Sequence, residues 1–170
     1  MPKEKVQPIR IYIYKDTKET VLKHRKLQGY ILFLCAALLC FFLIFTRNYI
    51  CIWGNSMLPT LKPGQLISCF QDKTPDIGDI VVLKVEGKQI IKRVIALPGD
   101  AVTLNNGILF RNGIVISENY ALLDATNYGP IIVPAGHLFV LGDNRAHSKD
   151  SRQIGCISID SYRGTVILPK

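Results

Sequence analysis

The stretch DIVVLKVEGKQIIKRVIA, residues 79–96, decides the fold, because it holds two runs rich in valine and isoleucine. Each run, Asp79–Val85 and Gln89–Ala96, has the length and β-branched composition of a strand. The same pattern predicts further strands over 66–70, 101–104, 108–110, 114–116, 131–133, 137–141, 154–159 and 165–168. Pro-Gly and Asn-Gly turn signals separate many of them. We therefore expect a mostly β domain, an antiparallel coiled sheet resembling a small barrel or sandwich.

An apolar segment precedes this domain. Tyr30–Phe45 is sixteen apolar residues without a break, and Gly29 and Thr46 extend it to eighteen uncharged positions. As a helix it would be about 27 Å long, close to the thickness of a bilayer core. A cleavable signal peptide is the rival interpretation, but the run is long for one and no small-x-small cleavage site follows. We expect a single uncleaved transmembrane helix.

The charges around this segment predict its orientation. Lys23-His24-Arg25-Lys26 precedes it and only Arg47 follows, so the positive-inside rule puts the N-terminus in the cytoplasm. We therefore expect a basic cytoplasmic tail over 1–28, a transmembrane helix over 29–47 and an extracytoplasmic catalytic domain over 48–170, with the cell membrane as the location and the lipid bilayer as a partner.

The later domain has almost no net charge. From residue 48 onward, twelve Lys or Arg stand against ten Asp or Glu, whereas residues 1–29 carry eight against three. A nucleic-acid-binding domain needs a basic surface, so we expect no nucleic-acid partner.

The five cysteines do not form a disulfide framework. Cys35, Cys40 and Cys51 fall in or just after the apolar segment, which leaves Cys69 and Cys156 as the pair within the later domain. The sequence leaves a Cys69–Cys156 bridge open. No C-x-x-C and no Cys/His cluster with zinc spacing occurs, so we expect neither a metal nor a cofactor.

Lys92 is an unusual residue for its strand. It lies in IIKRVI, residues 90–95, and strand alternation puts it on the same face as Ile90 and Val94. If that face is the core, desolvation lowers the pKa of the lysine, and a neutral amine can accept a proton from a serine hydroxyl. A lysine that protects an edge strand against aggregation is the blander alternative.

Two further polar stretches accompany Lys92. Ser56 lies in GNSMLPTL, residues 54–61, shortly after the apolar segment, where it could be a nucleophile or only a turn residue. The segment GDNRAHSKDSR, residues 142–152, could be a solvated hairpin or a buried hydrogen-bond network. It contains His147, the histidine nearest to a polar cluster, but a Ser-Lys dyad needs no histidine.

Taken together and in order, four segments resemble the conserved boxes of bacterial type I signal peptidases. They are residues 54–61, Gly78-Asp-Ile-Val81, KRVIALPGD over 92–100, and 142–155. The resemblance, with the apolar segment ahead of it, spans from about residue 28 to the end. It implies a serine endopeptidase whose β domain rests an apolar surface on the bilayer and which removes signal peptides with small residues before the cut from exported preproteins. The implied roles are Ser56 as nucleophile, Lys92 as general base, Ser148 as the hydroxyl that orients the lysine, and Asp143, Arg145, Asp150 and Arg152 as bracing residues.

One departure concerns the oxyanion. The best-known Gram-negative relatives carry a serine two positions before the nucleophile, whose hydroxyl helps to bind the oxyanion, whereas this chain has Gly54. The Ser56 N–H remains one candidate donor, and the second could be another backbone N–H or the Asn55 side chain. Only about forty residues separate Asp100 from Leu141, so the inserted cap of some relatives is reduced, as in compact Gram-positive forms.

The strand that carries Lys92 also predicts how a substrate would bind. An extended peptide could add to the strand that ends at Lys92. Shallow pockets lined by Met57, Ile90 and Ile91 would exclude large side chains. The alternatives are a conjugation-type processing protease, a self-cleaving Ser-Lys repressor protease, and a non-catalytic assembly factor for surface structures. The apolar segment and the balanced later domain argue against the repressor protease.

Overall fold

The computed structural model describes residues 10–45, 48–71 and 74–168, and the chain divides into two units, 1–47 and 48–170. Residues 1–9 of the predicted tail and 46–47 of the predicted membrane segment lie outside the described residues, as do 72–73 and 169–170.

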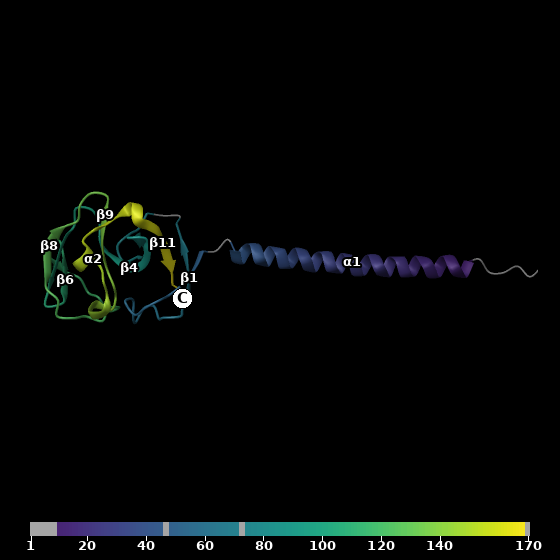
Figure 1. Cartoon of the computed structure of the whole chain (residues 1–170), viewed down its shortest axis with the longest axis horizontal. Helices are drawn as coiled ribbons and strands as arrows, with labels where there is room; N and C mark the ends of the chain where they lie inside the picture. Colours follow the sequence, from purple (N-terminus) through teal and green to yellow (C-terminus); the bar gives the residue numbers. More distant parts are fainter. Residues whose placement is uncertain (1–9, 46–47, 72–73, 169–170) are drawn as a thin grey trace, which may run out of the picture. The chain divides into compact units, whose positions relative to one another are not determined.

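The first unit is one long helix, α1, over Arg10–Phe45 (Figure 1). It begins well before residue 29, the predicted start of the membrane segment, because residues 10–28 contain no proline or glycine that would end a helix. In the described part of the chain, one helical stretch, Thr20–Phe42, is long and apolar enough to cross a membrane. The helix is therefore consistent with single-pass anchoring in a membrane.

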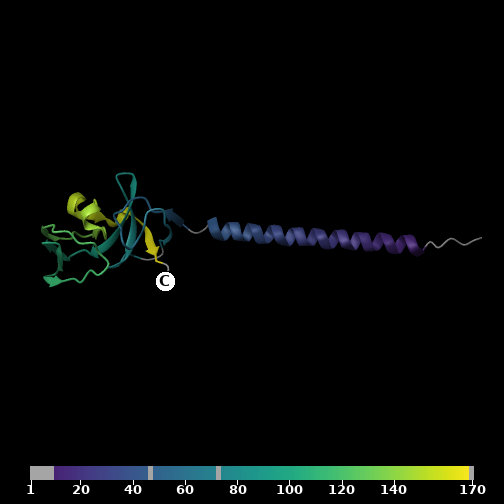
Figure 2. The ribbon, with the colours of Figure 1, turned by 90° about the horizontal axis from the view of Figure 1, so that it is seen from below.

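The second unit consists of two antiparallel sheets. The larger has the order β1-β2-β11-β3-β4-β9-β10 and the smaller has the order β7-β6-β5-β8. The strands are β1 (Asn48–Cys51), β2 (Leu66–Phe70), β3 (Ile80–Val85), β4 (Lys88–Ala96), β5 (Ala101–Asn105), β6 (Ile108–Arg111), β7 (Ile114–Val115), β8 (Tyr128–Ile132), β9 (His137–Leu141), β10 (Ile157–Ser158) and β11 (Tyr162–Ile167). Figure 1 and Figure 2 place β6 and β8 at the opposite end of this domain from β1 and β11. The predicted antiparallel fold is confirmed.

The strand predicted over 154–159 is wrong in most of its length. A short helix, α2 (Ser151–Ile154), takes its start, β10 keeps two residues, and a 3-10 turn, η2 (Ile159–Ser161), follows. The cause is local: the Asp150 side chain caps the first turn of α2 while the Gln153 side chain accepts a hydrogen bond from the Asp150 N–H. This reciprocal capping stabilises a helical turn where apolar content alone favours a strand.

Three apolar clusters fill the domain. The first joins β1, β2, β3 and β11 to the turn that follows β1, through Met57 and Leu61. The second lies between the two sheets and includes Phe139, and the third covers the other face of the larger sheet. Cys69 belongs to the first cluster and Cys156 borders the second, and both are free thiols. The structure therefore has no Cys69–Cys156 bridge.

Candidate active site

The turn after β1 holds Ser56 in a fixed position. Met57 and Leu61 are buried, with 2% and 0% of their surfaces exposed, and the Leu61 N–H donates to the Met57 carbonyl at 2.8 Å. The Leu58 N–H donates to the Asn55 carbonyl at 3.2 Å, which closes the chain around Ser56. Apolar anchors on one side and a tight turn on the other thus keep the half-buried serine at the domain surface.

Gly54 opens this turn in a conformation that suits glycine. Its φ is +96°, in the left-handed region that other residues adopt at a cost. A side chain there would meet no atom within 4 Å, so the constraint is the backbone and not space. The backbone conformation at position 54 therefore favours glycine over the serine that the Gram-negative relatives carry there.

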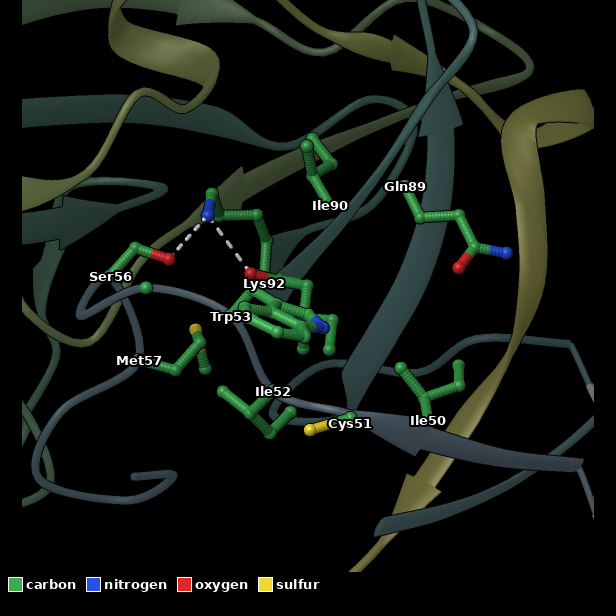
Figure 3. A pocket seen from close by; sticks show the side chains of 11 residues that line it. Ile50, Cys51, Ile52, Trp53, Ser56, Met57, Gln89, Ile90 and Lys92 are labelled. Atoms are coloured by element: carbon green, nitrogen blue, oxygen red, sulfur yellow. Dashed lines mark hydrogen bonds between the residues drawn. The ribbon is translucent and has the colours of Figure 1, made fainter. Parts of the chain in front are cut away.

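Lys92 lies on β4 with its ammonium group inside the protein. Only 4% of its surface is exposed, and Nζ donates to Ser56 Oγ and to the Ile91 carbonyl, each at 2.9 Å (Figure 3). Burial lowers the pKa of Lys92 from 10.5 to about 8, although the charges of Asp150 and Asp143 act to raise it. Both hydrogen-bond partners of the amine are neutral, so no direct ion pair within the described part of the chain offsets the cost of burying its charged form.

Asp143 and Asn144 tie the 142–152 loop to the Ser56 turn. Asp143 accepts two hydrogen bonds from Arg93, at 2.9 and 2.7 Å, and one from Thr60 Oγ1 at 2.5 Å. The Asn144 N–H donates to the Ser56 carbonyl at 3.0 Å, and its side-chain amide donates to the Asn55 carbonyl at 3.1 Å. The backbone on both sides of Ser56 is therefore fixed by one residue.

The two arginines of the loop are paired with carboxylates. Arg145, with 2% of its surface exposed, forms a two-point ion pair with Glu118 and donates to the Gly142 carbonyl. Arg152 pairs with Asp150 at 2.9 Å and with Asp124 at 3.3 Å. The predicted bracing residues are thus charged groups in a buried network rather than in a solvated hairpin.

Ser148 does not make the hydrogen bond that the resemblance implied. Its Oγ is buried and has no partner within the described residues, whereas Lys92 Nζ bonds to Ser56 and Ile91. Gly142 lies against it: a side chain on Gly142 would stand 2.2 Å from Ser148 Oγ. The structure therefore brings Ser56 and Lys92 together and leaves Ser148 unbonded in the wall of the site.

Several members of this network were not predicted from the sequence. Glu118 and Asp124 come from the segment between β7 and β8, more than twenty residues from the arginines that they bind. Arg93 was visible as a second cation in an apolar strand, and it also lies 4.0 Å from the centre of the Tyr120 ring. Buried arginines require carboxylate partners, which was the available signal, but nothing in the spacing said which carboxylates.

A groove leads along β4 to the Ser56–Lys92 pair. Its lining includes all three predicted residues, Met57, Ile90 and Ile91, together with apolar residues of β1 and the turn, among them Trp53 (Figure 3). β3 pairs with β4 from Lys88 to Arg93, whereas β9 pairs with it only from Arg93 onward. Residues 88–92 thus have one strand edge without a strand partner in the described part of the domain. Within 10–45, 48–71 and 74–168, the residues that the structure describes, no group of His, Cys, Asp and Glu side chains could hold a metal ion.

Comparison with known proteins identifies the family of the chain. Residues 25–169 match the family described as signal peptidase, peptidase S26. The chain is 40% identical over 138 residues to probable signal peptidase I-1 of Synechocystis sp., covering 72% of this chain and 69% of the relative. It is 39% identical over 140 residues to signal peptidase I of Bacillus caldolyticus, covering 70% and 76%. A crystal structure of a signal peptidase I from Enterococcus faecalis is 30% identical and covers 55% of this chain and 97% of that one, with a TM-score of 0.48. The chain belongs to the signal peptidases of peptidase family S26, serine endopeptidases that cleave signal peptides from preproteins.

Proposed function

We propose that Ser56 is the nucleophile and Lys92 the general base of this peptidase. The observation that carries the proposal is the 2.9 Å contact between Ser56 Oγ and the buried Lys92 Nζ. With a pKa of about 8, roughly one Lys92 in ten is neutral at pH 7, against fewer than about one in a thousand for an ordinary lysine. A neutral amine in contact with a hydroxyl favours an active enzyme over a non-catalytic assembly factor.

In the first step, neutral Lys92 accepts the proton of Ser56 Oγ as the oxygen attacks the carbonyl carbon of the scissile bond. The carbonyl oxygen becomes an oxyanion. When the tetrahedral intermediate collapses, the C–N bond breaks and Lys92 returns the proton to the departing amine of the mature chain. The signal peptide remains as an ester on Ser56.

In the second step, Lys92 accepts a proton from a water molecule, which attacks the ester carbonyl. The C–O bond to Ser56 breaks, the signal peptide leaves as a carboxylic acid that loses its proton to solvent, and Ser56 Oγ takes the other proton back from Lys92. The hydrogen bond from Nζ to the Ile91 carbonyl holds the amine in place through both steps. One residue therefore acts as base and acid in turn.

The oxyanion requires donors close to Ser56. The Ser56 N–H is one, since a backbone N–H next to the nucleophile faces the position where the charge develops. The second is the Asn55 side-chain amide or a neighbouring N–H, because Gly54 has no hydroxyl. Asn144 supports either choice by holding both carbonyls of this turn.

The substrate is held as an added strand. Its backbone pairs with the free edge of residues 88–92, and the groove lined by Met57, Ile90 and Ile91 takes small side chains before the cut. Anchoring by α1 keeps the enzyme at the bilayer, which raises the local concentration of membrane-inserted precursors. The charges on either side of the apolar segment favour a cytoplasmic N-terminus and a catalytic domain on the outer face.

The test is cleavage of a synthetic precursor by the full chain in detergent, comparing wild type with Ser56→Ala and Lys92→Ala. Each substitution should abolish cleavage. Ser117→Ala and Lys84→Ala are the matched controls, since both residues are exposed and lie outside the groove, and each should cleave like wild type. Full activity in Ser56→Ala would sink the proposal.

A further inference from the structure

The groove continues beyond the residues that lead to Ser56. A second hollow is lined by Tyr49, Ile50, Cys69, Val82, Gln89 and Arg163, which come from β1, β2, β3, β4 and β11. Ile50 and Gln89 line both spaces, so the two lie next to each other. Figure 3 shows Ile50 and Gln89 at the end of the row of lining side chains that lies away from Ser56.

The charge of this lining has one sign. Arg163 is the charged residue of the second hollow and Lys92 that of the first, and no carboxylate lines either of them. Arg163 Nη1 donates to the Asp160 and Tyr162 carbonyls, at 2.9 and 2.8 Å, which holds the guanidinium at the mouth of the hollow. Among the described residues no carboxylate forms an ion pair with Arg163, so its charge is available to a ligand.

The strand geometry gives the register of that ligand. An extended peptide advances about one residue for each residue of the strand that it pairs with. Gln89 lies three positions before Lys92 on β4. In a substrate that runs parallel to β4 with its scissile carbonyl at Ser56 beside Lys92, a residue about four positions before the cut lies opposite Gln89, and the next residue reaches Arg163.

We infer that the second hollow binds the substrate residue about five positions before the scissile bond and that Arg163 sets its charge preference. Acidic and neutral side chains are accepted there, and lysine or arginine is disfavoured by repulsion from the guanidinium. The inference rests on the proposed function, because cleavage at Ser56 fixes the register of the peptide.

The test uses the full chain in neutral detergent micelles and peptide precursors that carry either glutamate or lysine at each position from three to seven before the cut. For wild type, the ratio of kcat/KM for the glutamate and lysine peptides should peak near the fifth position, at about three- to tenfold. In Arg163→Glu the ratio at that position should fall below one. Because each ratio is measured within one variant, a partly unfolded preparation does not change it.

Lys62→Glu is the matched control, since it makes the same charge change at an exposed residue that lines neither hollow, and its profile should follow wild type. The same ratio in wild type and Arg163→Glu at every position would overturn the inference while leaving cleavage by Ser56 intact. An effect of anionic phospholipid that requires Arg163, with no peptide preference, would assign the hollow to a lipid headgroup and would also overturn it. Equal cleavage by Ser56→Ala would instead overturn the proposed function.

Discussion

Lys92 and Arg93 are neighbours on β4 and both are buried, with 4% and 9% of their surfaces exposed, but the protein treats their charges in opposite ways. Arg93 forms a two-point ion pair with Asp143, to which it donates both hydrogen bonds. Lys92 donates hydrogen bonds to the Ser56 hydroxyl and the Ile91 carbonyl, and burial lowers its pKa to about 8. The contrast supports the proposed role of Lys92, because the neighbouring arginines are paired with carboxylates while the lysine has no direct ion pair among the described residues.

The largest expected effect tests whether Lys92 acts as a base. In Lys92→Arg the guanidinium cannot lose its proton, so kcat/KM should fall by on the order of 10⁴-fold or more, as when one member of a serine-protease triad is lost. Cleavage of a precursor peptide measures it, and Lys84→Arg on the exposed side of β3 provides the control. Retained activity would mean that charge, not proton transfer, is what this position supplies.

The next effect concerns the braced region. Glu118→Ala leaves the Arg145 guanidinium buried without its partner, which should reduce the free energy of unfolding by about 3–5 kcal/mol. Denaturant unfolding of the full chain in detergent measures the change, and Asp160→Ala, which removes an exposed carboxylate, should change little. A Glu118→Leu/Arg145→Met double variant should recover much of the loss, because it leaves no unpaired charge. Equal stability of Glu118→Ala and wild type would show that the buried Arg145 does not depend on its carboxylate partner, and would contradict the contrast between the paired arginines and Lys92.

A somewhat smaller effect of opposite sign is expected at the dyad. The folded-state pKa of Lys92 lies below that of an unfolded lysine, so near neutral pH the unfolded chain binds more protons and the lysine destabilises the fold. Lys92→Met should therefore stabilise the protein by about 3 kcal/mol at pH 7, while abolishing activity. The gain should shrink as pH rises through 8 and disappear above about 10.5, which unfolding at several pH values checks. A gain independent of pH would assign the effect to packing instead.

The smallest predicted effect is the pH dependence of the intact enzyme. Because free Lys92 must be neutral to accept a proton, kcat/KM should rise about tenfold per pH unit and level off near pH 8. If kcat/KM instead levelled off near pH 10.5, the lysine would not be desolvated in solution. The measurement needs only wild type and a peptide substrate stable over the range.

Most of the fold and the Ser56–Lys92 pair could be predicted from the sequence, but the carboxylates that pair with Arg145 and Arg152 could not. β2 and β9 have the predicted bounds, because each is a short apolar run that begins just after a Pro-Gly or Pro-Ala-Gly turn signal. The 154–159 strand was wrong because a capping pair, Asp150 with Gln153, outweighs apolar content over so short a segment. Alternation placed Lys92 on a face, but the depth of burial depends on strands far away in the sequence.

The carboxylate partners of Arg145 and Arg152 could not be predicted for a similar reason. Glu118 and Asp124 lie in a segment without strand or helix periodicity. Their partners depend on how this segment packs against the loop, where Leu122 exchanges backbone hydrogen bonds with Asp143 and Arg145. The role implied for Ser148 came from the resemblance alone, and the structure leaves that hydroxyl unbonded.

Trp53 has a consequence for measurement. It is the chain's single tryptophan, it is 89% exposed, and it lines the groove two residues after Cys51. Indole emission shifts when water around the ring is displaced, so the intrinsic fluorescence of the unlabelled protein reports events at this one place. Occupancy of the groove could therefore be followed in Ser56→Ala, where a precursor binds without being consumed.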